Sequence, residues 1–173
     1  MWWLNLSKIT DLAKKAIESY VEKGEIISPP YNLDIEMQKK AGVFVCIKKA
    51  GALRGCIGTF APTKENVADE IIKNAIDSAS KDPRFPKITK NELSEISVSV
   101  DILTDPVRVK NIRELDAKKF GIIVKSGFRR GLLLPDLEGV NTPAQQIEIC
   151  RRKGGIGLEE EIELFKFEVR RFE

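Results

Sequence analysis

The 173-residue sequence contains no histidine. This absence excludes Ser-His-Asp triads, Cys-His nucleophile pairs and every metal site that uses an imidazole ligand. The remaining acidic residues and cysteines form no cluster with metal-ligand spacing, so we expect no metal ion. Any proton transfer must therefore be carried out by Cys, Asp, Glu, Lys or Tyr side chains.

Cysteine is scarce as well, with only Cys46, Cys56 and Cys150 and no CxxC motif. An odd number of scattered cysteines is typical of a reducing compartment rather than of a disulfide scaffold, so we expect a cytoplasmic protein. No apolar run reaches the length of a membrane span, and the first four residues lack the features of a signal peptide. The sequence therefore predicts no membrane association.

Neither sign of charge dominates, because 29 Lys and Arg are interleaved with 26 Asp and Glu, for a net charge of +3. This mixture does not predict nucleic-acid binding. No phosphate-binding loop or dinucleotide fingerprint is present, so we expect no cofactor. We expect Trp2 and Trp3 to pack on the body of the protein or on a second subunit, which would make it a homodimer.

Hydrophobic periodicity predicts an α+β fold, with a largely antiparallel sheet and helices packed on it. Ser7, Thr63 and Thr142 are the expected N-caps of three helices, and Gln145 is expected to complete a capping box at Thr142. The expected elements are helices at 7–23, 34–40, 63–80 and 142–153, hairpins at 42–60 and 120–134, and strands at 96–102 and 161–172. Thr89 and Glu92 form a capping box for one short turn of helix, and a bulge is expected between Leu164 and Phe165 in the last strand.

The two halves of the chain are alike, because each has a hairpin with Arg-Gly in its second strand, then a helix and a strand. We interpret the whole chain, residues 1–173, as one domain of two lobes, built from repeats at about 42–103 and 120–172. The alternative is that any two hairpins share such features.

The segment from Leu53 to Phe60 is the strongest candidate for a site. It places Arg54 and Cys56 two positions apart in the second strand of the first hairpin, so their side chains share a face. Gly55 and Gly58 leave the backbone unshielded, which lets a ligand or another chain segment approach.

The register of this hairpin decides how its two cysteines lie. With a two-residue turn at Ala50-Gly51, Val45 is expected opposite Cys56 and Cys46 opposite Gly55. The thiols of Cys46 and Cys56 would then face opposite sides of the sheet.

Cys56 has two interpretations: a nucleophile whose thiolate is favoured by Arg54 and backbone amides, or a small buried hydrophobe. Arg54 and Arg130 each lie in an apolar strand, and a buried guanidinium must meet a carboxylate or an anionic ligand. Asp82, Asp101 and Glu163 are the candidate carboxylates.

The loop Asp82-Pro83-Arg84-Phe85-Pro86 follows a helix directly. Two prolines stiffen it, so Asp82 and Arg84 are expected in fixed positions. They are either functional groups or an Asp–Arg pair that satisfies itself within a surface loop.

Together, Leu53-Arg54-Gly55-Cys56-Ile57-Gly58, the Asp82–Pro86 loop and Arg130-Gly131 resemble the AMMECR-one domain family, from about Gly42 to the C-terminus. The resemblance implies an α+β fold of two repeats, with a cleft lined by the Leu53–Gly58 segment. It also implies a pathway shared with a Memo-like protein and a radical-SAM enzyme, and no established activity. The segment from Asp136 to Asn141 is shorter here than in many members of the family. A function that depends on the longer segment is therefore not expected in this chain.

Three functions follow from these residues. The first is binding of a small anionic or carbonyl-bearing molecule, or a peptide end, in a cleft lined by Arg54, Gly55, Gly58, Thr59, Arg84 and Arg130. The second is an enzyme with Cys56 as nucleophile or acid/base and Asp82 as a second catalytic group. The third is a module that docks a protein partner such as the Memo-like or radical-SAM protein.

Overall fold

The structure, a computed structural model, describes residues 3–173, with side chains from residue 8 onward. The expected packing of Trp2 and Trp3 lies outside these described side chains. The chain divides into two compact units: residues up to Ile102 with Arg170–Glu173, and residues Leu103–Val169. Both units combine antiparallel strands with helices, which confirms the predicted α+β class.

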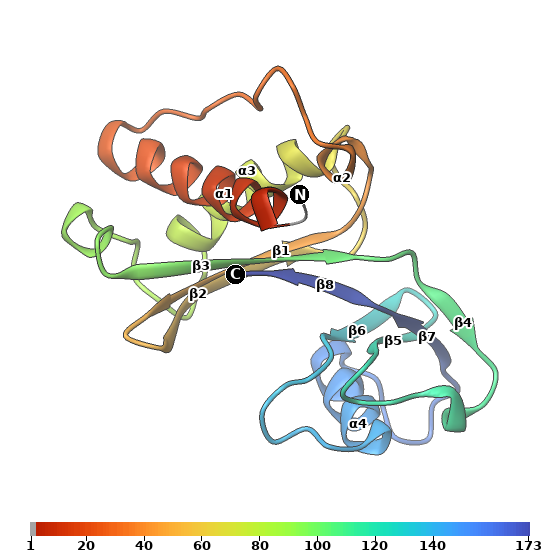
Figure 1. Ribbon diagram of the computed structural model, residues 1–173. Coiled ribbons are helices and arrows are strands. Elements are labelled where there is room, and N and C mark those ends of the chain that lie inside the picture. The colour runs from red at the N-terminus through yellow and green to blue at the C-terminus, as the bar shows by residue number, and fades with distance from the viewer. Residues whose placement is uncertain (1–2) are drawn as a thin grey trace. The chain divides into compact units, whose positions relative to one another are not determined.

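The first unit is a four-stranded sheet in the order β2-β1-β3-β8, with helices beside it (Figure 1). Its elements are α1 (Trp3–Lys23), α2 (Ile35–Gln38), β1 (Val43–Lys49), β2 (Ala52–Thr59), α3 (Val67–Ser80), the 3-10 helix η1 (Lys90–Glu92), β3 (Ile96–Leu103) and β8 (Val169–Phe172).

One face of this sheet carries the core of the first unit. Val43, Val45 and Ile47 alternate along β1 and are fully buried with the apolar sides of α1 and α3. In Figure 1, α1 and α3 lie on the same side of β1 and β3. The residues between them on β1, Phe44 and Cys46, therefore point to the opposite face of the sheet.

The β1–β2 hairpin contains a bulge that the sequence did not predict. Ala50 and Gly51 both have positive φ, as a two-residue turn of type I′ requires. Lys48 then lies opposite Leu53, but Ile47 lies opposite Gly55, so Arg54 is the extra residue. The bulge shifts the rest of the ladder by one position. Cys46 consequently lies opposite Cys56, so the expectation that their thiols face opposite sides is wrong.

The second unit has a sheet in the order β4-β7-β5-β6 and one helix. Its elements are β4 (Val107–Val109), the 3-10 helix η2 (Ile112–Glu114), β5 (Gly121–Ser126), β6 (Arg129–Leu133), α4 (Pro143–Gly154) and β7 (Glu163–Phe167). A separate apolar core that includes Ile122, Val124 and Cys150 lies between its sheet and α4.

Some predicted helix starts are confirmed, and others lie at different residues. The capping boxes at Thr89 and Thr142 are present. Ser7 is not an N-cap, because α1 already begins at Trp3. Thr63 is not one either, because α3 begins at Val67 and Asn66 caps it.

The C-terminal strand is two strands rather than one. It breaks at Glu168, and not between Leu164 and Phe165 as expected. β7 pairs with β4 and β5 in the second sheet, whereas β8 pairs with β3 in the first. Among the described helices, none combines the length and the apolar character that a membrane span needs.

Both units contain a hairpin, a helix and a further strand in the same order along the chain. In each sheet, the first strand of the hairpin lies between its partner and the strand that follows the helix. An internal duplication predicts this shared arrangement. The duplication itself stays a prediction, which superposition of the two units would test.

Candidate functional site

Arg54 is held by a carboxylate that the sequence analysis did not consider as its partner. Its Nε and Nη2 donate to Glu92 Oε1 and Oε2 at 2.9 and 3.0 Å. Its other donors reach the carbonyls of Pro86 at 2.8 Å and Lys87 at 3.3 Å. The guanidinium therefore makes a bidentate pair and is not free for an anionic ligand. Of the two partners expected for Arg54, a carboxylate or an anionic ligand, the structure shows the carboxylate, and it is Glu92 rather than Asp82, Asp101 or Glu163.

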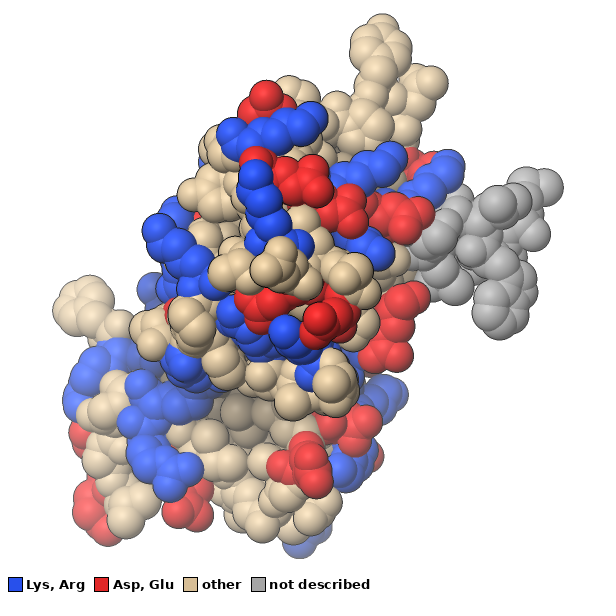
Figure 2. Space-filling view, turned by 90° about the vertical axis from the view of Figure 1, so that its left-hand side faces the viewer, with Lys and Arg blue, Asp and Glu red and all other residues tan. Residues whose placement is uncertain are grey.

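This ion pair differs from most charged contacts on the molecule. Figure 2 shows positive and negative side chains interspersed across much of the face it displays, and exposed pairs of this kind contribute little to stability. The side chains of Arg54 and Glu92 are only 14% and 15% exposed. Hydrogen bonding from Arg54, aided by the backbone N–H of Thr89, lowers the pKa of Glu92 from 4.5 to about 2.

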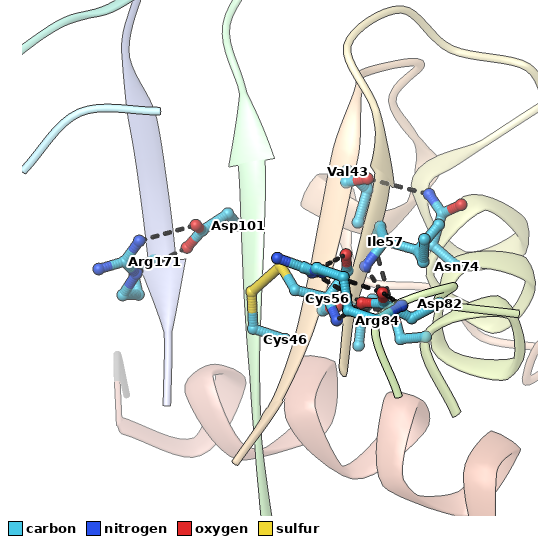
Figure 3. Close-up of a disulfide and its surroundings, with 11 residues drawn as sticks. Val43, Cys46, Cys56, Ile57, Asn74, Asp82, Arg84, Asp101 and Arg171 are labelled. Atoms are coloured by element: carbon cyan, nitrogen blue, oxygen red, sulfur yellow. Dashed lines mark hydrogen bonds and ion pairs between the residues drawn. A yellow bond between two sulfur atoms is a disulfide. The ribbon is translucent and has the colours of Figure 1, made fainter. Parts of the chain in front are cut away.

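Cys56 is bonded to Cys46 in a disulfide (Figure 3). The expectation that these cysteines remain unpaired is therefore wrong, and the cause is the bulge at Arg54, which places them opposite each other. A disulfide sulfur carries no thiolate, so a catalytic role for Cys56 would require the reduced pair.

The two glycines of the segment are covered by other parts of the first unit. A Cβ on Gly55 would overlap the carbonyl oxygen of Ser78, so α3 approaches the backbone of β2 there. A Cβ on Gly58 would overlap the ring of Phe44. Other chain segments therefore approach both glycines closely, which was one of the two outcomes expected. Gly55 is buried, whereas Gly58 is half-buried.

Asp82 and Arg84 form the self-satisfied pair that was one of the two expectations for their loop. Arg84 Nε and Nη2 donate to the two oxygens of Asp82 at 2.9 and 2.7 Å. The pair also binds the edge of β2, since Cys56 N–H donates to Asp82 at 2.9 Å and Arg84 donates to the Cys56 carbonyl at 3.2 Å (Figure 3). Mainly through the Arg84 hydrogen bonds, the pKa of Asp82 is held well below its usual value.

This contact protects the outer edge of the sheet. β2 is a terminal strand, and unpaired backbone groups on such a strand invite association with another chain. The Asp82–Arg84 pair occupies both backbone groups of Cys56, so that position is closed to an added strand.

A row of polar side chains on α3 was missed by the sequence analysis. Glu70, Asn74 and Ser78 are buried and lie four residues apart, on the helix face that packs on the sheet. Ser78 Oγ accepts from Ile57 N–H at 2.8 Å and donates to the Val45 carbonyl at 2.7 Å, so it bridges β1 and β2. Asn74 donates to the Val43 carbonyl at 2.9 Å (Figure 3).

Glu70 anchors the end of β2. Its carboxylate accepts hydrogen bonds from the Thr59 and Thr63 hydroxyls and from the backbone N–H groups of Thr63 and Lys64, at 2.7 to 2.8 Å. Burial raises the pKa of Glu70, but these hydrogen bonds outweigh it and leave the pKa below its usual value. Thr59 is therefore a structural group, and the i, i+4, i+8 polar spacing was the signal that could have found this row.

Arg130 lies in the second unit, on β6, and its side chain is exposed. The expectation that the Arg130 guanidinium is buried is therefore wrong. A Cβ on the next residue, Gly131, would overlap the Cys150 carbonyl on α4, as a Cβ on Gly55 would overlap that of Ser78 on α3. In both units, the glycine of the Arg-Gly pair lets the following helix approach the strand closely.

The first unit has a hollow of about 210 Å³ lined by Lys48, Ser97, Val98, Ser99 and Glu173. Lys48 lies opposite Ser97, and Ser99 lies opposite Cys46. These four residues consequently share the sheet face that points away from Val45 and Ile47. Within the described part of the chain, the Lys48 ammonium and the two serine hydroxyls have no hydrogen-bond or ion-pair partner.

The hollow can accept polar groups but has no metal-binding character. Lys48 supplies a positive charge, Ser97 and Ser99 supply hydroxyls that donate and accept, and Glu173 supplies a carboxylate. Over residues 3–173 as described, no group of three or more Asp, Glu or Cys side chains could hold a metal ion.

Comparison with known proteins shows relatives over nearly the whole chain. The sequence profile of the AMMECR1 family matches residues 10–172. A Thermotoga maritima protein is 48% identical over 163 residues, which cover 92% of this chain and 94% of that protein. A Clostridium acetobutylicum protein is 46% identical over 92% of this chain, but the match spans only 34% of that longer protein.

The fold is shared with a protein of known structure. The crystal structure of an uncharacterized protein from Pyrococcus horikoshii matches with a TM-score of 0.88 at 32% identity. The match covers 95% of this chain and 89% of the Pyrococcus chain.

Proposed function

This chain belongs to the AMMECR1 family, and on that premise we propose that it binds a small molecule or peptide end through a carbonyl or carboxylate group in the hollow beside β1 and β3. The relatives described above supply no activity for this chain, so the proposal depends on the site. One observation carries it: Lys48, Ser97 and Ser99 line one hollow and have no partner within the described residues.

We assign the binding role to Lys48 instead of Arg54. Arg54, Arg84 and Thr59 are engaged by Glu92, Asp82 and Glu70, respectively. The proposed ligand chemistry is unchanged, because an ammonium and two hydroxyls also suit a carbonyl or carboxylate oxygen.

The size and charge of the hollow limit the ligand. Pockets for drug-sized molecules measure about 300–1,000 Å³, so a hollow of about 210 Å³ suits a group of few atoms. The carboxylate of Glu173 would repel a ligand with several negative charges. The best match has one carboxylate or carbonyl for Lys48 and the serines, and a hydrogen-bond donor or positive charge for Glu173.

The test is untargeted mass spectrometry of the small molecules retained on natively purified protein. We expect a retained carboxylate or carbonyl compound that is lost from Lys48→Ala protein and kept by Lys14→Ala protein. Lys14 is an exposed lysine on α1 and serves as the matched control. A compound retained equally by both variants, or none retained by the wild type, would contradict the proposal.

The pathway with a Memo-like protein and a radical-SAM enzyme, and the cytoplasmic location, stay predictions. They rest on the family resemblance and on the cysteine content of the sequence. Co-purification of the tagged chain from its source cells would test the pathway.

A further inference from the structure

The disulfide between Cys46 and Cys56 joins two neighbouring strands directly across the β1–β2 ladder. The Cα atoms are 4.1 Å apart. The backbone groups of Cys56 point outward to Asp82 and Arg84, so this is the closely spaced, non-hydrogen-bonded kind of antiparallel pair. The two sulfur atoms are therefore held next to each other by the sheet itself.

This disulfide closes a short loop. A disulfide stabilises a protein mainly by constraining the unfolded chain, and a short loop gains less from it than a long one. Here the cysteines are ten residues apart, and in the folded protein a tight turn also joins the two strands. β1 is also paired with β3 on its other side. Opening the bond would thus leave the strands paired and the two thiols still adjacent.

The two cysteines are also accessible in a way that the third is not. Cys46 and Cys56 are half-buried and lie on the sheet face opposite the α3 side of their own unit. Cys150 is fully buried in the core of the second unit, and burial raises the pKa of its thiol to about 12. Thiol chemistry requires a thiolate and access, so it is directed to the Cys46–Cys56 pair.

We propose that Cys46 and Cys56 are a reversible redox site, opened in the folded protein by a dithiol reductant such as a CxxC-containing protein, or by two molecules of glutathione. A thiolate of the reductant attacks one sulfur, forms a mixed disulfide with that cysteine and releases the other cysteine as a thiolate. The second thiol of the reductant then displaces the remaining cysteine. Two electrons pass to the pair, the reductant becomes a disulfide, and its two protons end on the two cysteines.

This proposal is independent of ligand binding in the hollow. A catalytic role for Cys56 would need a free thiol, and the reduced state of the pair would supply it. Ser99, which lines the hollow, lies opposite Cys46, so the two sites are neighbours on one sheet face.

The experiment incubates the folded protein in glutathione buffers from fully oxidised to fully reduced, blocks thiols with a maleimide, and measures the intact mass. We expect two labels per chain in reduced buffer, both at Cys46 and Cys56 by peptide mapping, and none in oxidised buffer. Cys150 should stay unlabelled throughout unless the protein is denatured. The reduced form should stay folded, with a melting temperature no more than about 10 °C below that of the oxidised form, as expected for opening a loop of ten residues.

A second measurement uses Cys46→Ser, which leaves Cys56 without its partner. In oxidised glutathione this variant should gain one glutathione at Cys56, whereas the wild type should gain none because its own cysteine resolves the mixed disulfide. Reduction of the wild type only in denaturant, failure of the dithiol to reoxidise, or no glutathione on the variant would each overturn the proposal.

Discussion

Replacing Arg54 by alanine distinguishes an architectural role for this residue from a ligand-binding one. In the structure the change removes a bidentate partner from Glu92 and a donor from each of two carbonyls, those of Pro86 and Lys87. If the role is architectural, the loss appears in the free energy of unfolding and not in ligand retention.

The magnitude follows from the pKa of Glu92. A pKa lowered from 4.5 to about 2 corresponds to about 3 kcal/mol of preference for the carboxylate in the folded state. Arg54 shares this effect with the Thr89 backbone and hydroxyl, so we assign about half of it to Arg54. The Pro86 and Lys87 carbonyls are exposed, so water replaces their lost donors and they add little. We therefore expect Arg54→Ala to lose about 2 kcal/mol, a fall of about 4–8 °C in melting temperature.

The effect should depend on pH in a defined direction. Because the folded state lowers the pKa of Glu92, the carboxylate contributes stability that is fully present above its ordinary pKa of 4.5. That contribution is lost as the pH falls toward about 2. The difference in unfolding free energy between wild type and Arg54→Ala, measured by denaturant titration, should thus be constant near pH 7 and shrink below pH 4.5.

Two further variants sharpen the assay. Lys49 also contacts Glu92, at 3.6 Å, but its side chain is 35% exposed, so Lys49→Ala should change the unfolding free energy much less than Arg54→Ala. Arg54→Lys keeps the charge but loses the bidentate geometry. Its loss of unfolding free energy should lie between those of Arg54→Ala and Lys49→Ala. If Arg54→Ala were as stable as Lys49→Ala, the Arg54–Glu92 pair would have no structural role.

Other contacts around β2 make three further predictions. Gly55→Ala should cost more than about 2 kcal/mol, because its Cβ overlaps backbone, and thermal melting checks this. Ser78→Ala should cost about 1–3 kcal/mol in denaturant titration, because it leaves two backbone groups unsatisfied, whereas the exposed Ser97→Ala should change stability by less than about 0.5 kcal/mol. Glu70→Gln should destabilise near pH 7 and do so less as the pH falls below 4.5, since the lowered pKa of Glu70 makes its carboxylate a stabilising group only while it is ionised.

Local patterns in the sequence were sufficient for most elements. The positive φ values of Ala50 and Gly51 match the turn expected from Ala-Gly between two apolar strands. The box at Thr142 and Gln145 was predicted from residues three apart, and it starts α4 as expected. Such features depend on neighbours within a few residues, which the sequence displays directly.

The functional assignments could not be predicted in the same way. Which carboxylate meets Arg54 depends on the loop that brings Glu92 beside β2, 38 residues later in the chain. The hollow beside Lys48 exists because β3 lies between β1 and β8, the strand that leads to Glu173. No local pattern marks Ser97 or Ser99 as members of a site.

Hydrophobic periodicity is enough to specify two apolar hairpins, the helices that follow them and the α+β class, and the composition leaves no histidine chemistry. The folded chain adds that one extra residue, Arg54, shifts the β1–β2 ladder and places Cys46 against Cys56. A strand has a period of two, so a single bulged residue reverses which side chains share a face. At the bulge the strand is contacted by distant parts of the chain: α3 approaches Gly55, and Glu92 of η1 pairs with Arg54.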